Sequence, residues 1–209
     1  MALIQFKNVT KRFDRKVIFN QLSFDINAGD FVLFQGPSGM GKTTLFQLIL
    51  GFEAVDAGEI HFEGQLLHPK LLPGLRKKIA YVPQIIDWGQ GKVIDIIEEF
   101  MSFQANIHLT HWRKLLPGFM MRFELEAGLL EKDFSMLSGG EKQRMAIIQA
   151  LLLERKIFLL DEPTAALDTP MKQKVIQYFS ERTDATLLVI SHDPDWQQIP
   201  NIKINLLNQ

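Results

Sequence analysis

The chain has 209 residues, of which 46% are hydrophobic, and its formal net charge at pH 7 is −1. This length is typical of one domain, and the hydrophobic content is enough for a buried core. A net charge close to zero gives no global attraction to nucleic acid or to anionic lipid, so we expect no nucleic-acid partner. The lack of cysteine excludes disulfides and thiolate metal sites, and it is consistent with a reducing compartment.

The sequence predicts neither a signal peptide nor a membrane-spanning helix. Residues 1–13 lack the basic start and long apolar core of a signal peptide. The longest charge-free apolar runs, such as residues 146–153, are far shorter than the roughly 18 residues needed to cross a bilayer. We therefore expect a soluble, cytoplasmic protein.

The N-terminal part of the chain predicts two strands. Residues 3–9 and 17–26 alternate apolar and polar side chains, as half-buried strands do, and a turn follows at residues 27–30. Phe13 lies between the two runs. Two interpretations of this residue stay open: its ring packs within the hairpin, or it stacks on a nucleotide base.

Residues 36–44, with the sequence GPSGMGKTT, are the most informative stretch of the chain. They fit the pattern G-x-x-x-x-G-K-[ST], between an apolar run of strand length at 31–35 and one of helix length at 44–52. Glycines at this place let backbone N–H groups surround a phosphate at the start of a helix. Lys42 adds a positive charge for the β- and γ-phosphates, and the Thr43 hydroxyl is placed to bind Mg²⁺. The predicted phosphate-binding residues are Gly36, Pro37, Ser38, Gly39, Met40, Gly41, Lys42, Thr43 and Thr44.

Two further strands are predicted after this glycine loop. Residues 58–64 read as a strand closed by a turn, and residues 79–83 as a strand that leads to Gln84. Because Gln84 follows a strand in a phosphate-binding chain, we expect it to contact Mg²⁺ or a water molecule.

Residues 91–134 predict a helical insert. Strand signals stop there, apolar residues recur at helical spacing, and Pro117-Gly118 interrupts the pattern. At about forty residues, the insert is too small to be a separate domain. The bulky residues in the insert and just before it form either the core of the insert, which we favour, or an exposed apolar patch that binds a partner. These residues are Trp88, Trp112, Met120 and Met121.

The stretch Ser138-Gly139-Gly140-Glu141 predicts a helix start, because a serine followed three residues later by a glutamate forms a capping box. Two glycines in a first helical turn each cost on the order of 1 kcal/mol relative to alanine. They are explained if bare backbone N–H groups must approach an anion, so we interpret this helix start as a second phosphate site. The alternative is a well-formed N-terminus with no ligand.

Residues 157–160, which follow Lys156, are apolar without alternation, which indicates a strand buried on both faces of a mostly parallel sheet. Asp161 and Glu162 follow at the carboxyl end of this strand, where α/β sheets present their ligands. We expect Asp161 to hold the Mg²⁺ shell and Glu162 to polarise an attacking water.

The last part of the chain predicts another buried strand, at residues 186–191, which leads to His192. We expect this histidine to contact a γ-phosphate. A helix from about residue 170, a short helical turn at 194–198 and an edge strand at 202–206 complete the predicted elements.

Taken in this order, the motifs resemble those of ABC-type ATPases over nearly the whole chain, and LSGGE at residues 137–141 is highly specific to that family. The resemblance implies ATP and Mg²⁺ as cofactors. It also implies an α/β P-loop NTPase fold with a mostly parallel core sheet, an N-terminal antiparallel β subdomain and a small helical insert. Residues 1–209 would be a single domain, with a helical subdomain of about 85–150 inserted in a RecA-like core.

The resemblance also implies a role for each motif. Phe13 falls where the family usually has an aromatic residue, most often tyrosine, that stacks on adenine. The implied roles are the Walker A loop for Gly36 to Thr44, the Q-loop for Gln84, the signature for Ser138 to Glu141, the Walker B acid for Asp161, the catalytic base for Glu162, the D-loop acid for Asp168 and the switch histidine for His192.

In proteins of this family, the signature of one copy faces the nucleotide of a second. The expected partner is therefore a second copy of the chain or a homologous subunit, with two ATP molecules bound head to tail. The favoured function is the ATPase subunit of a membrane transporter, peripheral on the cytoplasmic face of the inner membrane, with separate transmembrane permease subunits.

A non-transport ABC ATPase that acts on a division or translation complex is the alternative function. It is disfavoured because translation-type relatives usually carry two cassettes, and DNA-repair relatives carry long coiled coils. A small-molecule kinase would leave LSGGE and His192 unexplained. The compact insert and the expected lack of a C-terminal regulatory domain argue against the larger sugar-importer type, and the cargo and its direction stay open.

Overall fold

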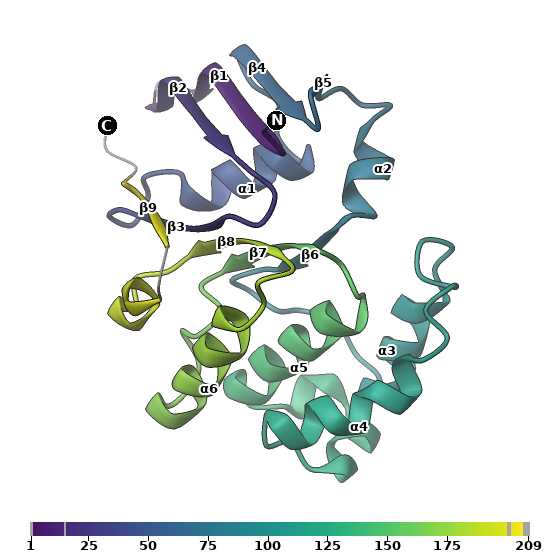
Figure 1. The fold of residues 1–209 in the computed structure, drawn as a ribbon. Coiled ribbons are helices and arrows are strands. Elements are labelled where there is room, and N and C mark those ends of the chain that lie inside the picture. Colours follow the sequence, from purple (N-terminus) through teal and green to yellow (C-terminus); the bar gives the residue numbers. More distant parts are fainter. Residues whose placement is uncertain (1, 15, 200–201, 207–209) are drawn as a thin grey trace.

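The computed structural model describes residues 2–14, 16–199 and 202–206, which form two sheets with helices around them (Figure 1). The first sheet is antiparallel in the order β2-β1-β4-β5, and the second is parallel at every pairing in the order β6-β7-β8-β3-β9. The α/β fold with an N-terminal antiparallel part is therefore confirmed. The strands are β1 (Ile4–Phe13), β2 (Lys16–Ile26), β3 (Phe31–Gln35), β4 (Ala57–Phe62), β5 (Gln65–Leu66), β6 (Ile79–Val82), β7 (Ile157–Asp161), β8 (Thr186–Ile190) and β9 (Lys203–Leu206).

The helices cover both faces of the parallel sheet (Figure 1). One of them, α1, lies between the two sheets, whereas α5 and α6 pack on the opposite face and α3 and α4 lie beyond α5. Within the described residues, no helix is both long enough and apolar enough to cross a bilayer. The α-helices are α1 (Lys42–Leu50), α2 (Leu72–Arg76), α3 (Val93–Ser102), α4 (Trp112–Arg122), α5 (Gly139–Leu152) and α6 (Thr169–Ser180), and the 3₁₀ helices are η1 (Ala127–Glu131), η2 (Phe134–Met136) and η3 (Pro194–Gln198).

Strand β7 shows why its sequence lacks alternation. All five of its residues are buried, because the sheet is covered on both faces. Leu159 belongs to the core between the sheet and α1, and its neighbours Phe158 and Leu160 belong to the core under α5 and α6. Two hydrophobic cores therefore meet at this strand.

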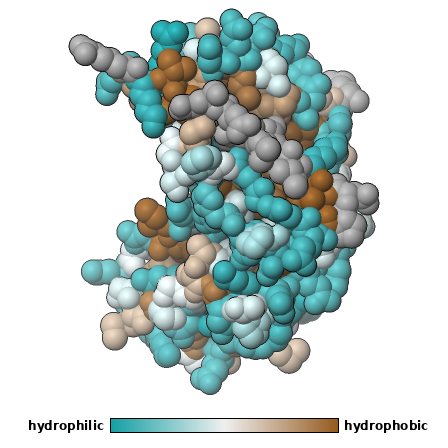
Figure 2. Space-filling model, turned by 90° about the vertical axis from the view of Figure 1, so that its left-hand side faces the viewer, coloured by the Kyte–Doolittle hydropathy of each residue, from teal (hydrophilic) through white to brown (hydrophobic). Residues whose placement is uncertain are grey.

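The face of the molecule seen in Figure 2 is mostly hydrophilic, with scattered apolar patches, and its outline is indented at mid-height.

The bulky residues of the predicted insert belong mainly to its core, as the favoured interpretation states. Trp112 and Met120 are buried, and the Trp88 ring stacks on Phe134 with 4.8 Å between the ring centroids. Met121 differs from the others, because 79% of it is exposed.

Two element boundaries differ from the sequence-based prediction. Phe13 does not lie between strands: β1 continues to Phe13, through irregularities in its register with β2 that an alternation pattern does not reveal. Helix α4 continues through Pro117, which was expected to interrupt it, because a proline removes only one N–H from the helical hydrogen bonds and neighbouring turns hold the helix. Strand β5 and helix α2 were not predicted, since two and five residues are too short to show a period.

We expect Gly58→Ala to destabilise the fold much more than Gly89→Ala. Both glycines have a left-handed backbone, with φ of +82° and +81°, so both substitutions pay about 1–2 kcal/mol for the added Cβ. At Gly58 the Cβ would also stand 2.3 Å from the carbonyl oxygen of Asn8 in β1, whereas at Gly89 nothing lies within 4 Å. The clash should add roughly 1–3 kcal/mol, measured as a difference in unfolding free energy in urea. Equal losses for the two variants would contradict the close packing of β4 on β1.

Candidate functional site

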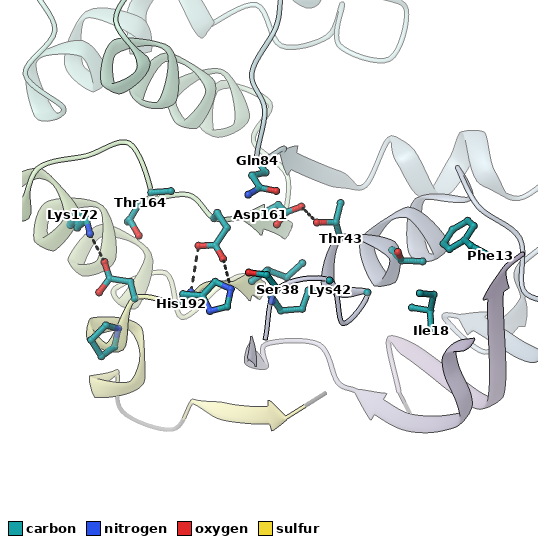
Figure 3. A pocket seen from close by; sticks show the side chains of 18 residues that line it. Phe13, Ile18, Ser38, Lys42, Thr43, Gln84, Asp161, Thr164, Lys172 and His192 are labelled. Carbon is teal, nitrogen blue, oxygen red and sulfur yellow. Dashed lines mark hydrogen bonds and ion pairs between the residues drawn. The ribbon is translucent and has the colours of Figure 1, made fainter. Parts of the chain in front are cut away.

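A cavity of about 760 Å³ lies beside the carboxyl ends of β3, β6, β7 and β8. It brings together four predicted motifs that are far apart in the sequence, as Figure 3 shows for the glycine loop, Gln84, the Asp161 region and His192. Phe13 lies at one end of the same cavity. The predicted residues that line it are Phe13, Ser38, Gly39, Gly41, Lys42, Thr43, Thr44, Gln84, Asp161, Glu162 and His192.

The glycine loop closes tightly onto the N-terminus of α1. Gly41 caps the helix with a left-handed φ of +90°, and no side chain satisfies the first N–H groups of the helix there. A Cβ on Gly41 would also stand 2.2 Å from Ile18 in β2. The loop therefore presents bare N–H groups beside the cavity, which is the arrangement that binds a phosphate.

Lys42 is the cation of this loop. Its Nζ donates to the carbonyl oxygens of Gly36 and Pro37 at 2.8 and 3.0 Å, so the loop folds around its own ammonium group. Burial lowers the pKa of Lys42, although the carboxylates of Glu162 and Asp161 act in the opposite direction. Gly36, Pro37 and Met40 belong to the loop but do not line the cavity.

Asp161 is joined to the glycine loop by a hydrogen bond. The Thr43 hydroxyl donates to its Oδ2 at 2.8 Å. Asp161 is only 1% exposed, and this burial raises the pKa of its carboxyl group, as the charge of Glu162 also does, against the lowering effects of the Thr43 bond and Lys42. Its second oxygen, Oδ1, is buried and accepts no hydrogen bond from the described residues. A buried carboxylate oxygen without a hydrogen bond costs free energy, and a bound ion or water at this position would remove that cost.

Glu162 follows with an unusual backbone. Its φ is +51°, a left-handed value that is rare for a residue with a side chain, and its N–H donates to Ile190 O in β8 at 2.8 Å. The conformation turns the carboxylate toward His192, whose backbone N–H lies 3.4 Å from Glu162 Oε2 and whose Nε2 lies 3.7 Å from Oε1. Glu154 has the same φ of +51° outside the cavity, so this backbone orients the Glu162 carboxylate but does not by itself mark a functional site.

The helix start at Ser138 does not contribute to this cavity. Its capping box is complete: Ser138 Oγ accepts from the Glu141 N–H at 3.3 Å, and Glu141 Oε2 accepts from the Ser138 N–H at 2.8 Å. The bond from the Ser138 backbone N–H, and in second place the Ser138 side chain, lower the pKa of the Glu141 carboxyl group. A Cβ on Gly140 would stand 3.1 Å from Ala166 O, so this glycine has a packing reason within the chain, whereas Gly139 has only ordinary contacts.

Asp168 also lies outside the cavity, and it caps α6 by accepting a hydrogen bond from Met171 N–H at 3.0 Å.

Sequence reasoning missed several residues that line the cavity, because nothing in their local pattern distinguishes them. Among them, Lys172 on α6 pairs with Asp193 at 3.0 Å, beside His192. The missed residues are Ile18, Thr164, Ala165, Lys172, Ile190, Asp193 and Pro194.

Comparison with known proteins places this geometry in context. A family model described as ABC transporter matches residues 19–165. A spermidine/putrescine import ATP-binding protein from Mycoplasma capricolum is 31% identical over 213 residues, which cover 99% of this chain and 59% of that protein. A zinc import ATP-binding protein from Rickettsia bellii is 34% identical over 194 residues, covering 91% of this chain and 76% of that protein. The chain thus spans little more than half the length of the spermidine/putrescine relatives.

The fold is also similar to that of a solved structure. The dimeric, post-hydrolysis structure of an ATP-binding cassette bound to ADP and Pi has a TM-score of 0.76 and 28% sequence identity. The match covers 92% of this chain and 89% of that one.

We expect Asp161→Asn to stabilise the protein without nucleotide or metal. Because the pKa of Asp161 is raised in the folded state, its protonated form is the one that folding favours, and that stability is lost as the pH rises through the raised pKa. At pH 8 the variant avoids burying a charge and should be more stable than the wild type. The gain should shrink as the pH falls toward the raised pKa, which urea unfolding at several pH values measures.

Asp184→Asn is the control, because the pKa of Asp184 is shifted in the opposite direction. A hydrogen bond from Arg182 lowers the pKa of this exposed carboxyl group, so replacing the carboxylate with an amide should not stabilise the protein at pH 8. An Asp161→Asn variant that is less stable than the wild type at every pH would contradict the dominance of burial at Asp161.

Proposed function

Because the chain belongs to the family of ABC transporter ATP-binding cassettes, we propose that it binds and hydrolyses ATP to power transport across a membrane through separate transmembrane subunits. The observation that carries the proposal is the single cavity in which the glycine loop, two carboxylates and a histidine meet. The relatives named as import ATP-binding proteins support coupling to transport.

The loop and its neighbours divide the binding of Mg²⁺-ATP between them. The loop N–H groups and Lys42 bind the phosphates. Thr43, Asp161 and Gln84 would hold the magnesium ion, and the unpaired Oδ1 of Asp161 supports this set. The described residues contain no group of three or more His, Cys, Asp or Glu that could hold a metal by itself, which fits an ion that shares its ligands with phosphate oxygens. When bound, the ion supplies positive charge to the β- and γ-phosphates.

Glu162 is the proposed catalytic base. It orients and polarises the attacking water, while His192, 3.7 Å from its carboxylate, contacts the γ-phosphate. In-line attack needs little beyond such positioning and charge stabilisation. Phe13 stacks on the adenine ring of ATP. The residue is 40% exposed and lines the cavity, which supports stacking on a nucleotide over packing within the hairpin.

The second phosphate-facing motif acts between two copies. Residues 138–141 lie outside the cavity of their own chain, with a helix N-terminus that is free to face a nucleotide held by another. The similarity to a dimeric cassette supports an ATP sandwich of two copies, or of this chain and a homologous subunit, with Asp168 near the second site. The helical part, about residues 85–150, would receive the transmembrane subunits at the cytoplasmic face of the membrane.

We expect Glu162→Gln to abolish ATP turnover by at least about 100-fold while ATP binding persists, since only the base is lost. Steady-state hydrolysis and equilibrium binding measure the two effects. Glu154→Gln is the matched control, because Glu154 has the same φ of +51° but does not line the cavity. Turnover at the full rate in Glu162→Gln would remove Glu162 from its role.

We expect Ser138→Arg to block ATP-induced dimerisation while the monomer still binds ATP, because the arginine fills the space of the nucleotide held by the other copy. Size-exclusion chromatography with ATP, in the Glu162→Gln background, gives the readout. Ser138→Ala removes the capping hydrogen bond without adding bulk and should dimerise. A Ser138→Arg protein that dimerises as before would count against the sandwich.

An ABC ATPase that drives a division or translation complex is the competing function. Purification of the tagged Glu162→Gln variant with ATP from gently solubilised membranes distinguishes the two. Transport requires a protein with several membrane spans in stoichiometric amount. A soluble or single-span partner alone would favour the competing function.

A further inference from the structure

Lys11 is a buried lysine that does not itself line the cavity but contacts Phe13, which does, and the hydrolysis described above does not use it. It lies in β1, two residues before Phe13, and only 6% of it is exposed. Burying an ammonium group is costly unless the group is paired and hydrogen-bonded. The partners of Lys11 therefore show what keeps it there.

Lys11 Nζ has three close partners. It donates to Glu53 Oε2 at 2.8 Å and to Ala54 O at 3.0 Å, and it lies 4.6 Å from the centroid of the Phe13 ring, over the face of that ring. An ammonium group has three protons, and two oxygens and a ring face account for all of them. The distance to the ring is within the range of a cation–π interaction.

Through these contacts, Lys11 connects Phe13 to the C-terminal end of α1, the helix that begins at the glycine loop. Glu53 and Ala54 lie in the loop that follows α1. Asp56 of the same loop accepts from the Arg12 N–H at 2.5 Å and donates its own N–H to Thr10 O at 2.9 Å. The end of β1 is therefore fastened to this loop on both sides of Lys11. In contrast, Phe13 itself is 40% exposed and has no polar atom in its side chain.

We propose that Lys11, held by Glu53, is a positioning residue that fixes the Phe13 ring as the platform for the base of the nucleotide. This inference rests on the proposed function, because it requires ATP in the cavity. The ammonium covers one face of the ring and leaves the other for a flat aromatic base. Lys11 then contributes to the affinity for a nucleoside triphosphate but not to the affinity for the phosphate chain alone.

The test compares two ligands, ATP and inorganic tripolyphosphate, each with Mg²⁺. Lys11→Met keeps most of the length of the side chain and removes the charge. We expect the Kd for ATP to rise about tenfold, as loss of a base–aromatic stack does, while the Kd for tripolyphosphate is unchanged. The KM for ATP should rise with kcat unchanged. Lys11→Arg should restore ATP affinity, because a guanidinium also lies over aromatic rings.

Lys78→Met is the control outside the cavity, at a lysine whose side chain is 51% exposed where that of Lys11 is 8% exposed. Lys78 Nζ lies 5.6 Å from the Phe62 ring centroid and 2.5 Å from Glu63, which repeats the lysine–phenylalanine–glutamate arrangement outside the cavity. Both affinities should be unchanged in this variant. In a Phe13→Ala background, Lys11→Met should have no further effect on ATP binding, because the ring it positions is gone.

Loss of the lysine leaves Glu53 without its cation, so the double variant Lys11→Met, Glu53→Gln serves if the single variant does not fold, with melting temperature as the check. Glu53→Gln alone keeps a neutral acceptor and should show the same selective loss at a smaller size. The role of Lys11 is overturned if the Kd values for ATP and tripolyphosphate rise equally, or if a folded variant binds ATP with unchanged affinity. A wild-type protein that binds no ATP overturns the proposed function, and the role of Lys11 with it.

Discussion

One hydrogen bond, from the Thr43 hydroxyl to the buried carboxylate of Asp161, joins two segments that are 118 residues apart. It forms only because β3 and β7 run parallel in one sheet, so that the glycine loop and the acidic pair leave the sheet at the same edge. The Asp161 side of the bond depends on burial. The hydrophobic cores on both faces of β7 remove Asp161 from water, and this raises the free energy of its charge until a cation or a proton compensates it.

The sequence was sufficient to predict the parts of the site that are continuous in the chain. The glycine loop, the strand that ends at Asp161 and the capping box at Ser138 each carry their own pattern, and the fold and the family they indicated are confirmed. The roles of the individual residues stay predictions. What could not be predicted depends on contacts between distant segments. Lys172 reaches the site because α6 packs beside η3, and no feature of its neighbours in the sequence marks it.

At the helix start formed by residues 138–141, the two glycines have two different explanations. From the sequence, both glycines were explained by the approach of an anion. In the structure, Gly140 lies against the backbone of Ala166, in the loop that carries Asp168, so a packing constraint is sufficient to explain it. No such constraint acts on Gly139, and the anion explanation is therefore concentrated on that residue. The same contact places the signature and the loop before α6 next to each other, so the two are expected to move together.

The sheet order β8-β3-β9 also determines when the site can form during synthesis of the chain. Strand β3, which leads into the glycine loop, pairs with Leu187 and its neighbours on one side and with Lys203 and its neighbours on the other. Both partners leave the ribosome long after β3 does. A nascent chain therefore carries a complete glycine loop with no sheet to hold it until the last strands emerge, and such late pairing of distant strands makes folding slow. The nucleotide binding proposed above therefore requires the finished fold and is not a step that guides the early chain toward it.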